Sequence, residues 1–335
     1  MELTTVADDE AVVHDGLDVR AYDGLEPDTV YEYDGFVFRT LPRPPGELLC
    51  TFATVNDVHF GETICGLMDG HTTGPVFTAE DGEEPYPVTM NRGAIHEIEQ
   101  ADPAVVLVKG DLTSEGTVEE YEDFLEFYGE AFGERLVHVR GNHDAYYGAT
   151  FADTATQAVH LPGVTLAVLD TSIPAQASGQ VTGEQLGWLH DLAAEADRPV
   201  LVFGHHHVWS PESNHRDPDY FGIDPDSSER LVEVVGARPA IVGYFAGHTH
   251  RNRVRRFGLS RDVPWVEVGC VKDFPGAWAE YRVYEGGILQ VLRRISQPDA
   301  LVWTEKTRQM FDGFYFDYAF GELHDRCFPI WPRER

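Results

Sequence analysis

Short apolar runs, separated by longer amphipathic stretches, begin at Leu48 and continue to about residue 268. The runs read LLCTFATV, AVVLVK, RLVHVR, VTLAVL, PVLVF, AIVGYFA and VPWVEV. Continuous apolar runs of this length are typical of strands that are covered on both faces. The pattern therefore predicts a series of buried strands rather than strands with one face in water.

The stretches between the runs carry apolar residues at a spacing of three to four. In residues 118–132 the apolar positions are Tyr121, Phe124, Leu125 and Tyr128, and in residues 183–196 they are Leu186, Leu189 and Leu192. This spacing predicts helices whose apolar stripes face the core. Strands that alternate with helices predict an α/β fold in which helices cover the faces of a sheet.

The two ends of the chain differ from this middle region. Residues 1–46 are acidic and rich in Gly and Pro, which predicts a partly ordered lead-in. Residues 47–296 form the predicted main domain, and AEYRVYEGGILQVLRRI near its end predicts a hairpin that turns at Gly286-Gly287. Residues 297–335 are rich in aromatic side chains, and we expect them to pack on the main domain.

Composition narrows the cellular setting. No apolar run approaches the roughly 18 residues of a membrane span, and the first twenty residues lack the features of a signal peptide. The four cysteines are far apart and form no CxxC pair, which favours free thiols in a reducing compartment. We therefore expect a protein that is not exported, does not contact a membrane and works in the cytoplasm.

Charge argues against polyanionic partners. The chain has 57 acidic and 25 basic residues, a formal net charge of −32, and its few lysines are Lys109, Lys272 and Lys306. Such an excess repels nucleic acid, whose binding depends on Lys and Arg contacts to phosphates. Scarce lysine with abundant Asp, Glu and Val resembles proteins of salt-loving archaea, and a halophilic setting would explain the charge without reference to the substrate.

Polar side chains follow five of the predicted strands, at the point where each strand ends. The clusters contain Asp57 and His59, Asp111, Asn142 with His143 and Asp144, the run His205 to His207, and His248 with His250. In open α/β sheets, ligands bind at the carboxyl ends of the strands. Carboxylate, imidazole and amide oxygen suit divalent Zn, Mn, Fe or Co. The set is too large for one ion and sufficient for two ions that share a carboxylate.

These clusters, D-x-H, G-D, G-N-H-D, G-H and G-H-x-H in this order, resemble the calcineurin-like metallophosphoesterase superfamily from residue 54 to about 270. The segment SGQVTGEQLGWLHDLAAEADRPVLVFGHHH is most similar to class III cyclic nucleotide phosphodiesterases and related phosphohydrolases. The resemblance implies a two-sheet sandwich flanked by helices, with the metal site at the C-terminal ends of the strands. It also implies a phosphohydrolase that cleaves a phosphodiester or phosphomonoester by in-line attack of a metal-bridging hydroxide.

The resemblance also implies a role for each residue. One metal is held by Asp57, His59 and His250, the other by Asn142, His205 and His248, and Asp111 bridges the two. His143 contacts the substrate phosphate as a catalytic residue, and Asp144 orients His143. His206 is interpreted as a packing or supporting residue and His207 as facing substrate or solvent, although the choice between His205 and His206 as ligand stays open.

Two departures and two loops qualify the resemblance. GDLTSEG lacks the tyrosine that purple acid phosphatases carry after G-D, and the histidine run continues as HHHVWSP rather than into prolines. An insertion near residues 60–90 is expected to cover the mouth of the site, where His71 is either a substrate contact or a solvated loop residue. The loop 208–227 is a second candidate rim, in which Trp209 and Tyr220 stack on a base or pack on the lid.

Three functions remain to be distinguished. The first is hydrolysis of a small phosphate ester, most simply a small-molecule phosphodiester. The second is a nuclease of the same superfamily, against which the sequence shows neither a basic stripe nor coiled-coil heptads. The third is a non-catalytic metal-binding scaffold, which would have no use for His143. The complete set of ligand positions together with His143 favours the enzyme.

Overall fold

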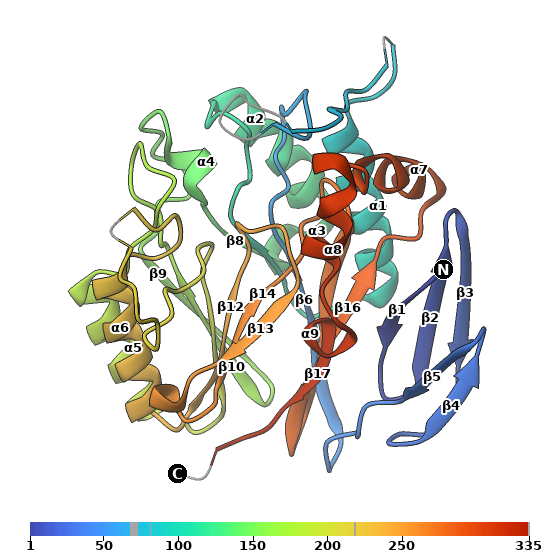
Figure 1. The fold of residues 1–335 in the computed structure, drawn as a ribbon. Helices are drawn as coiled ribbons and strands as arrows, with labels where there is room; N and C mark the ends of the chain where they lie inside the picture. Colours follow the sequence, from blue (N-terminus) through green and yellow to red (C-terminus); the bar gives the residue numbers. More distant parts are fainter. Residues whose placement is uncertain (68–72, 81, 218, 334–335) are drawn as a thin grey trace.

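The structure, a computed structural model, describes residues 1–67, 73–80, 82–217 and 219–333. Within this part of the chain, two six-stranded sheets lie face to face at the centre of the molecule (Figure 1). The first has the order β17-β16-β15-β6-β7-β8 and the second the order β13-β14-β12-β11-β10-β9. The first contains β6 (Leu48–Val55), β7 (Val106–Lys109), β8 (Leu136–Val139), β15 (Ala277–Tyr284), β16 (Gly287–Arg294) and β17 (Cys327–Ile330). The second contains β9 (Thr156–Leu161), β10 (Val164–Leu169), β11 (Val200–Phe203), β12 (Ile241–Ala246), β13 (Arg253–Arg256) and β14 (Pro264–Glu267).

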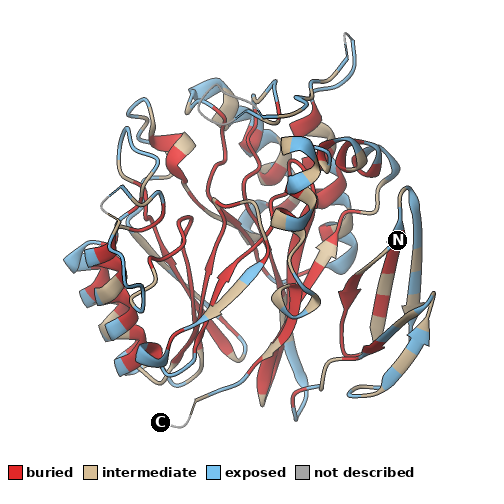
Figure 2. Cartoon of the chain, viewed as in Figure 1, coloured by how far each residue is buried: buried red, intermediate tan, exposed pale blue. Residues whose placement is uncertain are grey.

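Helices cover the outer faces of both sheets, so that the sandwich has the predicted αββα layers (Figures 1 and 2). The helices are α1 (Tyr86–Ala101), α2 (Val118–Phe124), α3 (Glu130–Phe132), α4 (Asn142–Ala145), α5 (Gly183–Glu195), α6 (Pro225–Ala237), α7 (Pro298–Thr307), α8 (Phe314–Phe320) and α9 (Leu323–Arg326). Helices α1, α2 and α7 pack on the first sheet, and α5 and α6 pack on the second. Among the described residues, none of these helices combines the length and apolar character needed to cross a membrane.

The core between the sheets is built on three aromatic rings. Phe52 of β6 stacks on Tyr281 of β15 with ring centroids 4.5 Å apart, and Phe203 of β11 lies edge-on to both rings. Alternate residues of a strand point to opposite faces, so Ala53 and Val55 pack on the other side, beneath α1. Both faces are thus covered, which confirms the predicted α/β fold and explains the uninterrupted apolar runs.

The predicted helix at 183–196 is confirmed as α5, but the apolar stripe predicted for 118–132 is wrong at Leu125, which is 37% exposed. The chain forms a π-helical turn at Leu125–Gly129, between α2 and α3. A π turn is wider than an α turn, so residues four apart stay aligned there. Phe124, Tyr128 and Phe132 are consequently buried in line, and Leu125 points outward.

The predicted hairpin near residue 285 is formed by β15 and β16, with a turn one residue earlier than expected. Tyr284 pairs with Gly287, which leaves Glu285 and Gly286 as the two turn residues. A two-residue turn favours glycine because its backbone adopts conformations closed to other residues.

Residues 1–46 are not a partly ordered lead-in. They form a three-stranded sheet of β1 (Glu2–Val6), β2 (Glu10–Asp15) and β3 (Asp18–Asp23), and a hairpin of β4 (Val30–Tyr33) and β5 (Phe36–Arg39). Arg282 of β15 forms ion pairs of 2.7 Å with both Asp8 and Asp9, and one of 2.5 Å with Glu10. The acidic residues of this segment therefore have arginine partners far along the chain, which composition does not reveal.

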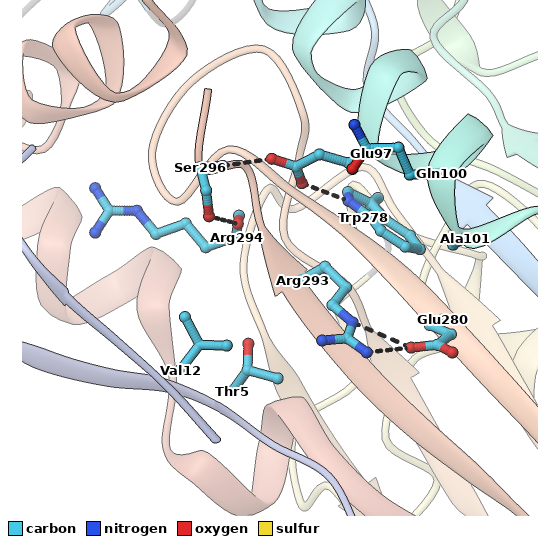
Figure 3. A pocket seen from close by; sticks show the side chains of 10 residues that line it. All are labelled: Thr5, Val12, Glu97, Gln100, Ala101, Trp278, Glu280, Arg293, Arg294 and Ser296. Atoms are coloured by element: carbon cyan, nitrogen blue, oxygen red, sulfur yellow. Dashed lines mark hydrogen bonds and ion pairs between the residues drawn. The ribbon is translucent and has the colours of Figure 1, made fainter. Parts of the chain in front are cut away.

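A cavity of 360 Å³ lies between this N-terminal sheet, α1 and β15–β16 (Figure 3). The charged side chains that line it have ion-pair or hydrogen-bond partners. Arg293 pairs with Glu280, and the Glu97 carboxylate accepts hydrogen bonds from the Trp278 indole (3.1 Å) and the Ser296 amide (2.7 Å). Glutamate and arginine side chains thus both line the cavity.

The C-terminal segment lies against the first sheet and its helices. Strand β17 pairs with β16, and Phe316 of α8 lies 5.2 Å from Phe274, measured between ring centroids. Trp303 of α7 stacks on Tyr86 at the start of α1, with centroids 4.2 Å apart. The described part of the 60–90 insertion packs here too, because Phe77 contacts the Trp303 ring.

A buried histidine of the N-terminal sheet, His14, predicts a loss of folding stability in acid. The His14 ring is fully buried, with Nδ1 2.8 Å from the Thr4 hydroxyl and Nε2 3.1 Å from the Ser296 hydroxyl. Burial, assisted by Arg294, lowers the pKa of His14 to about 3. The unfolded chain, with a histidine pKa of about 6.5, binds the proton first, so stability falls as the pH drops below that value.

Between pH 7 and pH 5, the unfolding free energy of the wild type should fall by about 2 kcal/mol more than that of His14→Gln. Urea denaturation of both proteins at both pH values and constant salt measures the difference. Because the comparison uses the change with pH, any constant effect of the substitution cancels. Equal losses in the two proteins would show that His14 is not buried in its neutral form.

Candidate metal centre

Hydrogen bonds tie together the loops that follow β6, β7, β8, β11 and β12. The Asp57 amide donates to the Gly110 carbonyl (3.1 Å), the His248 amide donates to the Asp57 carboxylate (3.0 Å), and the His143 amide donates to Asp111 Oδ1 (3.0 Å). Strands β6, β7 and β8 belong to one sheet, and β11 and β12 belong to the other. The predicted polar clusters therefore meet where the two sheets end together.

Two buried carboxylates form the centre of this meeting point. Asp111 Oδ2 lies 3.4 Å from His59 Nε2 and 3.2 Å from His205 Nε2. Asp57 Oδ1 lies 3.5 Å from His250 Nε2. Except for His250, which is partly exposed, these side chains are no more than 2% exposed. Charged groups this deeply buried require a partner of opposite charge.

Two more of the predicted ligands complete what we call the donor cluster. Asn142 Oδ1 lies 3.0 Å from His205 Nε2, and His248 offers a nitrogen within 4.8 Å of one on His205. The donor cluster consists of Asp57, His59, Asp111, Asn142, His205, His248 and His250. Ligand atoms within 4.8 Å of one another occur in the groups Asp57/His59/His250, Asp57/Asp111/His205 and His205/His206/His248.

Backbone carbonyls set the tautomers of two of these imidazoles. His205 Nδ1 lies 2.9 Å from the Lys109 carbonyl, and His248 Nε2 lies 2.9 Å from the Phe221 carbonyl. A carbonyl only accepts, so each of these nitrogens carries the hydrogen and donates it. When the ring is neutral, the lone pair is on the other nitrogen, Nε2 of His205 or Nδ1 of His248. This is how metal-binding histidines are usually oriented.

The backbone is strained at five members of the donor cluster. Asp57, His59, Asp111, His248 and His250 have φ angles of 55°, 47°, 49°, 66° and 55°, in the left-handed region that side-chain-bearing residues avoid. Each such residue costs on the order of 1–3 kcal/mol, and such strain concentrates at functional sites. The tight turns that these φ angles produce direct the side chains into one small volume.

Glycines at two strand ends make room for the donor cluster. A Cβ atom on Gly110 would lie 2.5 Å from Nδ1 of His205, and a Cβ atom on Gly141 would overlap the Asp111 carboxylate. Gly110 also has a φ of 87°. The glycines of the G-D and G-N-H-D motifs are therefore required by close approach of the backbone to the side chains of other loops.

The charges of the donor cluster shift the pKa of several buried groups. Burial lowers the pKa of Lys109 to about 7, against the opposing effect of Asp57. Its ammonium donates to Asn56 Oδ1 (2.5 Å), and Asn56 in turn donates to the Asp57 carboxylate. Although burial opposes it, Asp111 raises the pKa of His205 to about 9. In the protein alone, a proton on His205 thus offsets part of the negative charge of the buried carboxylates.

The structure corrects the predicted role of Asp144. His143 Nδ1 lies 2.7 Å from the Ser114 carbonyl, so the backbone rather than Asp144 orients this imidazole. Asp144 instead accepts hydrogen bonds from the amides of Thr113 (2.8 Å) and Gly141 (2.7 Å). Burial and the nearby Asp111 raise its pKa to about 6. Asp144 therefore fastens the loop that carries Asp111 to the loop that carries His143.

The three histidines of the run 205–207 have different contacts. Nε2 of His205 faces Asp111 and Asn142, whereas Nδ1 of His206 lies 2.8 Å from the Thr171 hydroxyl. The sequence predicts that His207 faces substrate or solvent. It is instead buried against the rings of Tyr220 and Phe221.

The two predicted rims behave differently. His71 lies outside the described residues. In the loop 208–227, Trp209 and Tyr220 pack edge-on against each other with centroids 4.9 Å apart, and Trp209 is buried. The exposed aromatic residue of this loop is Phe221, 46% exposed and 5.3 Å from the His248 ring. The sequence carried a signal for it, because Phe221 directly follows Tyr220 in the predicted rim.

A sixth polar cluster escaped the sequence analysis. After β14 the chain reads VGCVKDFPG, and Asp273 Oδ2 of this loop lies 3.6 Å from Nδ1 of His250. The rule that found the other clusters, polar residues directly after a buried strand, does not find Asp273, because the stretch VGCV separates β14 from Lys272 and Asp273.

Solved structures with a similar fold include two phosphatases. A dimetal phosphatase from Danio rerio superposes with a TM-score of 0.56 at 14% identity, covering 74% of this chain and 98% of that one. A purple acid phosphatase from yellow lupin (Lupinus luteus) seeds gives a TM-score of 0.50 at 13% identity, covering 78% and 54%. At these identities the likeness concerns the fold alone.

Sequence relatives include a glycerophosphodiester phosphodiesterase from Enterobacter lignolyticus, 29% identical over 44% of this chain and 56% of the relative. A probable cyclic nucleotide phosphodiesterase from Synechococcus is 24% identical over 56% of this chain and 74% of the relative. A cAMP/cGMP dual specificity phosphodiesterase from Mycobacterium tuberculosis is 32% identical over 31% of this chain and 36% of the relative. The chain thus matches between about one third and three quarters of the length of these relatives.

The family model for calcineurin-like phosphoesterases matches residues 50–252, and these residues contain the whole donor cluster. The protein therefore belongs to the calcineurin-like phosphoesterase family.

Proposed function

We propose that this protein is a binuclear metal-dependent phosphohydrolase that cleaves a small phosphodiester. The position of Asp111 carries the proposal. One of its oxygens, Oδ2, lies within 3.4 Å of ring nitrogens of both His59 and His205, which belong to the two predicted ligand sets. A carboxylate between two sets of nitrogen and oxygen donors is the arrangement that a pair of divalent ions requires.

The donor cluster fits two such ions. Among the described residues, Nδ1 of the buried His59 ring has no hydrogen-bond partner, and Nε2 has only the Asp111 carboxylate at 3.4 Å, without hydrogen-bond geometry. A buried polar group without a partner calls for an explanation, and a bound ion supplies one. The donors are imidazole nitrogens and carboxylate or amide oxygens, which suit Mn, Fe, Zn or Co.

We assign the ligands as follows. Asp57, His59 and His250 hold one ion. Asn142, His205 and His248 hold the other. Asp111 is shared. The contacts support His205 rather than His206 as the ligand, because Nε2 of His205 lies 3.2 Å from Asp111 Oδ2 and the Lys109 carbonyl holds Nδ1 of the same ring.

When bound, two divalent ions supply positive charge to the phosphoryl oxygens and lower the pKa of water. His143 supplies the proton on the other side of the reaction. One of its nitrogens lies within 4.8 Å of ligand atoms of His59 and Asp111, and the Ser114 carbonyl fixes the ring through Nδ1. In this proposal Nε2 donates to the oxygen that leaves phosphorus, which makes His143 a general acid.

Several observations favour a small diester as the substrate. The relatives are named for glycerophosphodiesters and cyclic nucleotides, which are both small phosphodiesters. Phe221 and Tyr147 place exposed aromatic surface beside His248 and shortly after His143. The net charge of −32 disfavours a nucleic acid and therefore the nuclease alternative. His143 in turn disfavours a metal scaffold without catalysis.

We also place the protein in the cytoplasm. The supporting observation is that Cys50, Cys65, Cys270 and Cys327 are all free thiols, as a reducing compartment would keep them.

The rate of hydrolysis should depend on divalent metal. With added Mn²⁺ and high salt, the protein should hydrolyse a bis-aryl phosphate, and a chelator should abolish turnover until Mn²⁺ is restored. Release of the coloured phenol measures the rate, and an aryl monophosphate serves as the comparison substrate. Turnover that survives complete chelation, or no turnover of either ester, would contradict a metal-dependent phosphohydrolase.

Substitution by alanine should distinguish the role of His143 from that of His205. His143→Ala should keep both ions and lower kcat by about 10²–10⁴-fold, because only the general acid is lost. His205→Ala should bind one ion fewer. Calorimetric titration with Mn²⁺ gives the stoichiometry, and the bis-aryl phosphate assay gives kcat. If His143→Ala lost an ion, the assigned roles would be wrong.

A further inference from the structure

The Asp273 carboxylate receives contacts from several parts of the chain. It lies in the loop between β14 and β15 and is 1% exposed. Its Oδ1 accepts hydrogen bonds from the Tyr315 hydroxyl (2.7 Å) and the Cys270 thiol (2.9 Å). Its Oδ2 lies 3.1 Å from the Lys272 ammonium, 3.6 Å from the Cys65 thiol and 3.6 Å from Nδ1 of His250. One buried carboxylate thus joins the C-terminal segment to a member of the donor cluster.

These contacts fix the direction of the carboxylate. Two donors occupy Oδ1, so rotation of the group would break the hydrogen bonds to Tyr315 and Cys270. Lys272 is itself anchored, because its ammonium lies 2.7 Å from Glu62 Oε2. The remaining side of Oδ2 is therefore held toward the His250 ring.

A negative charge in this position sets the state of the His250 imidazole. The distance of 3.6 Å is long for a hydrogen bond, so the interaction acts mainly through charge, which is strong in a buried setting. It favours the hydrogen on Nδ1 and leaves the lone pair on Nε2, the nitrogen that lies 3.5 Å from Asp57. A carboxylate behind a histidine in this way makes it a better ligand.

We propose that Asp273 is a positioning residue for His250, and that Tyr315 of the C-terminal segment holds Asp273 in place. This inference rests on the proposed metal centre and adds a specific dependence to it. The affinity for one of the two ions depends on a helix, α8, that lies about 65 residues beyond His250 in the chain. Since such coupling is reciprocal, a bound ion also strengthens the docking of α8.

Two substitutions test this chain of contacts. Asp273→Asn removes the charge with almost no change in shape, and Tyr315→Phe removes only the hydroxyl that holds Oδ1. The matched control is Tyr281→Phe, which removes another buried hydroxyl, bonded to Gln290 Oε1 (3.0 Å) in the core between the sheets. All three variants are made in the full chain and checked for folding by circular dichroism.

Calorimetric titration with Mn²⁺ alone gives the readout, without any substrate. The wild type should bind two ions. Asp273→Asn should weaken one of the two binding events by about 10–100-fold and leave the other within about twofold. Tyr315→Phe should weaken the same event by a smaller factor. Tyr281→Phe should lower the thermal midpoint while leaving both binding events unchanged.

The outcomes separate this inference from the proposed function. If the wild type binds two ions and the folded Asp273→Asn and Tyr315→Phe variants bind both with wild-type affinity, the positioning role is wrong and the metal centre stands. If the wild type binds no Mn²⁺, the metal centre itself is wrong. If Asp273→Asn does not fold, Tyr315→Phe decides, because it keeps the carboxylate and its pairing with Lys272.

Discussion

The structure depends on the buried carboxylate of Asp111, which faces the imidazoles of His59 and His205 from one oxygen. A carboxylate that is 2% exposed is unfavourable unless positive charge neutralises it. In the protein alone, a proton on His205 provides part of that charge, because Asp111 raises the pKa of His205 against the effect of burial. Two divalent ions would provide it more completely. The left-handed backbone at Asp111 and at four of the surrounding ligands adds strain, which the rest of the fold must offset.

The two-sheet sandwich makes this concentration of strain and charge possible. One sheet supplies the loops after β6, β7 and β8, and the other supplies the loops after β11 and β12. The donor cluster therefore forms only when the sheets pack, and the contact of Phe52 and Tyr281 with Phe203 is part of the same assembly. The segments outside the family match contribute as well. Tyr315 of the C-terminal segment reaches the Asp273 carboxylate behind His250.

The strands, the α/β class and the polar clusters at the strand ends could be predicted from local patterns, and the family resemblance selected the members of the donor cluster from those clusters. Apolar runs mark strands, and strand ends collect ligands. What escaped prediction depends on contacts between distant parts of the chain. The N-terminal strands are docked by ion pairs to Arg282, and Leu125 is turned outward by a π turn that periodicity does not reveal. Asp144 accepts a hydrogen bond from the loop that carries Thr113 and does not orient His143. The Ser114 carbonyl already accepts the hydrogen bond from Nδ1 of His143.

The central claim is that Asp111 bridges two ions. Crystals grown with Mn²⁺, measured by anomalous X-ray diffraction, test it most directly. We expect two anomalous peaks about 3.5–4 Å apart. The Asp111 carboxylate should lie between them, His59 should contact one peak, and His205 rather than His206 should contact the other. A single peak, or two peaks that do not share Asp111, would contradict it.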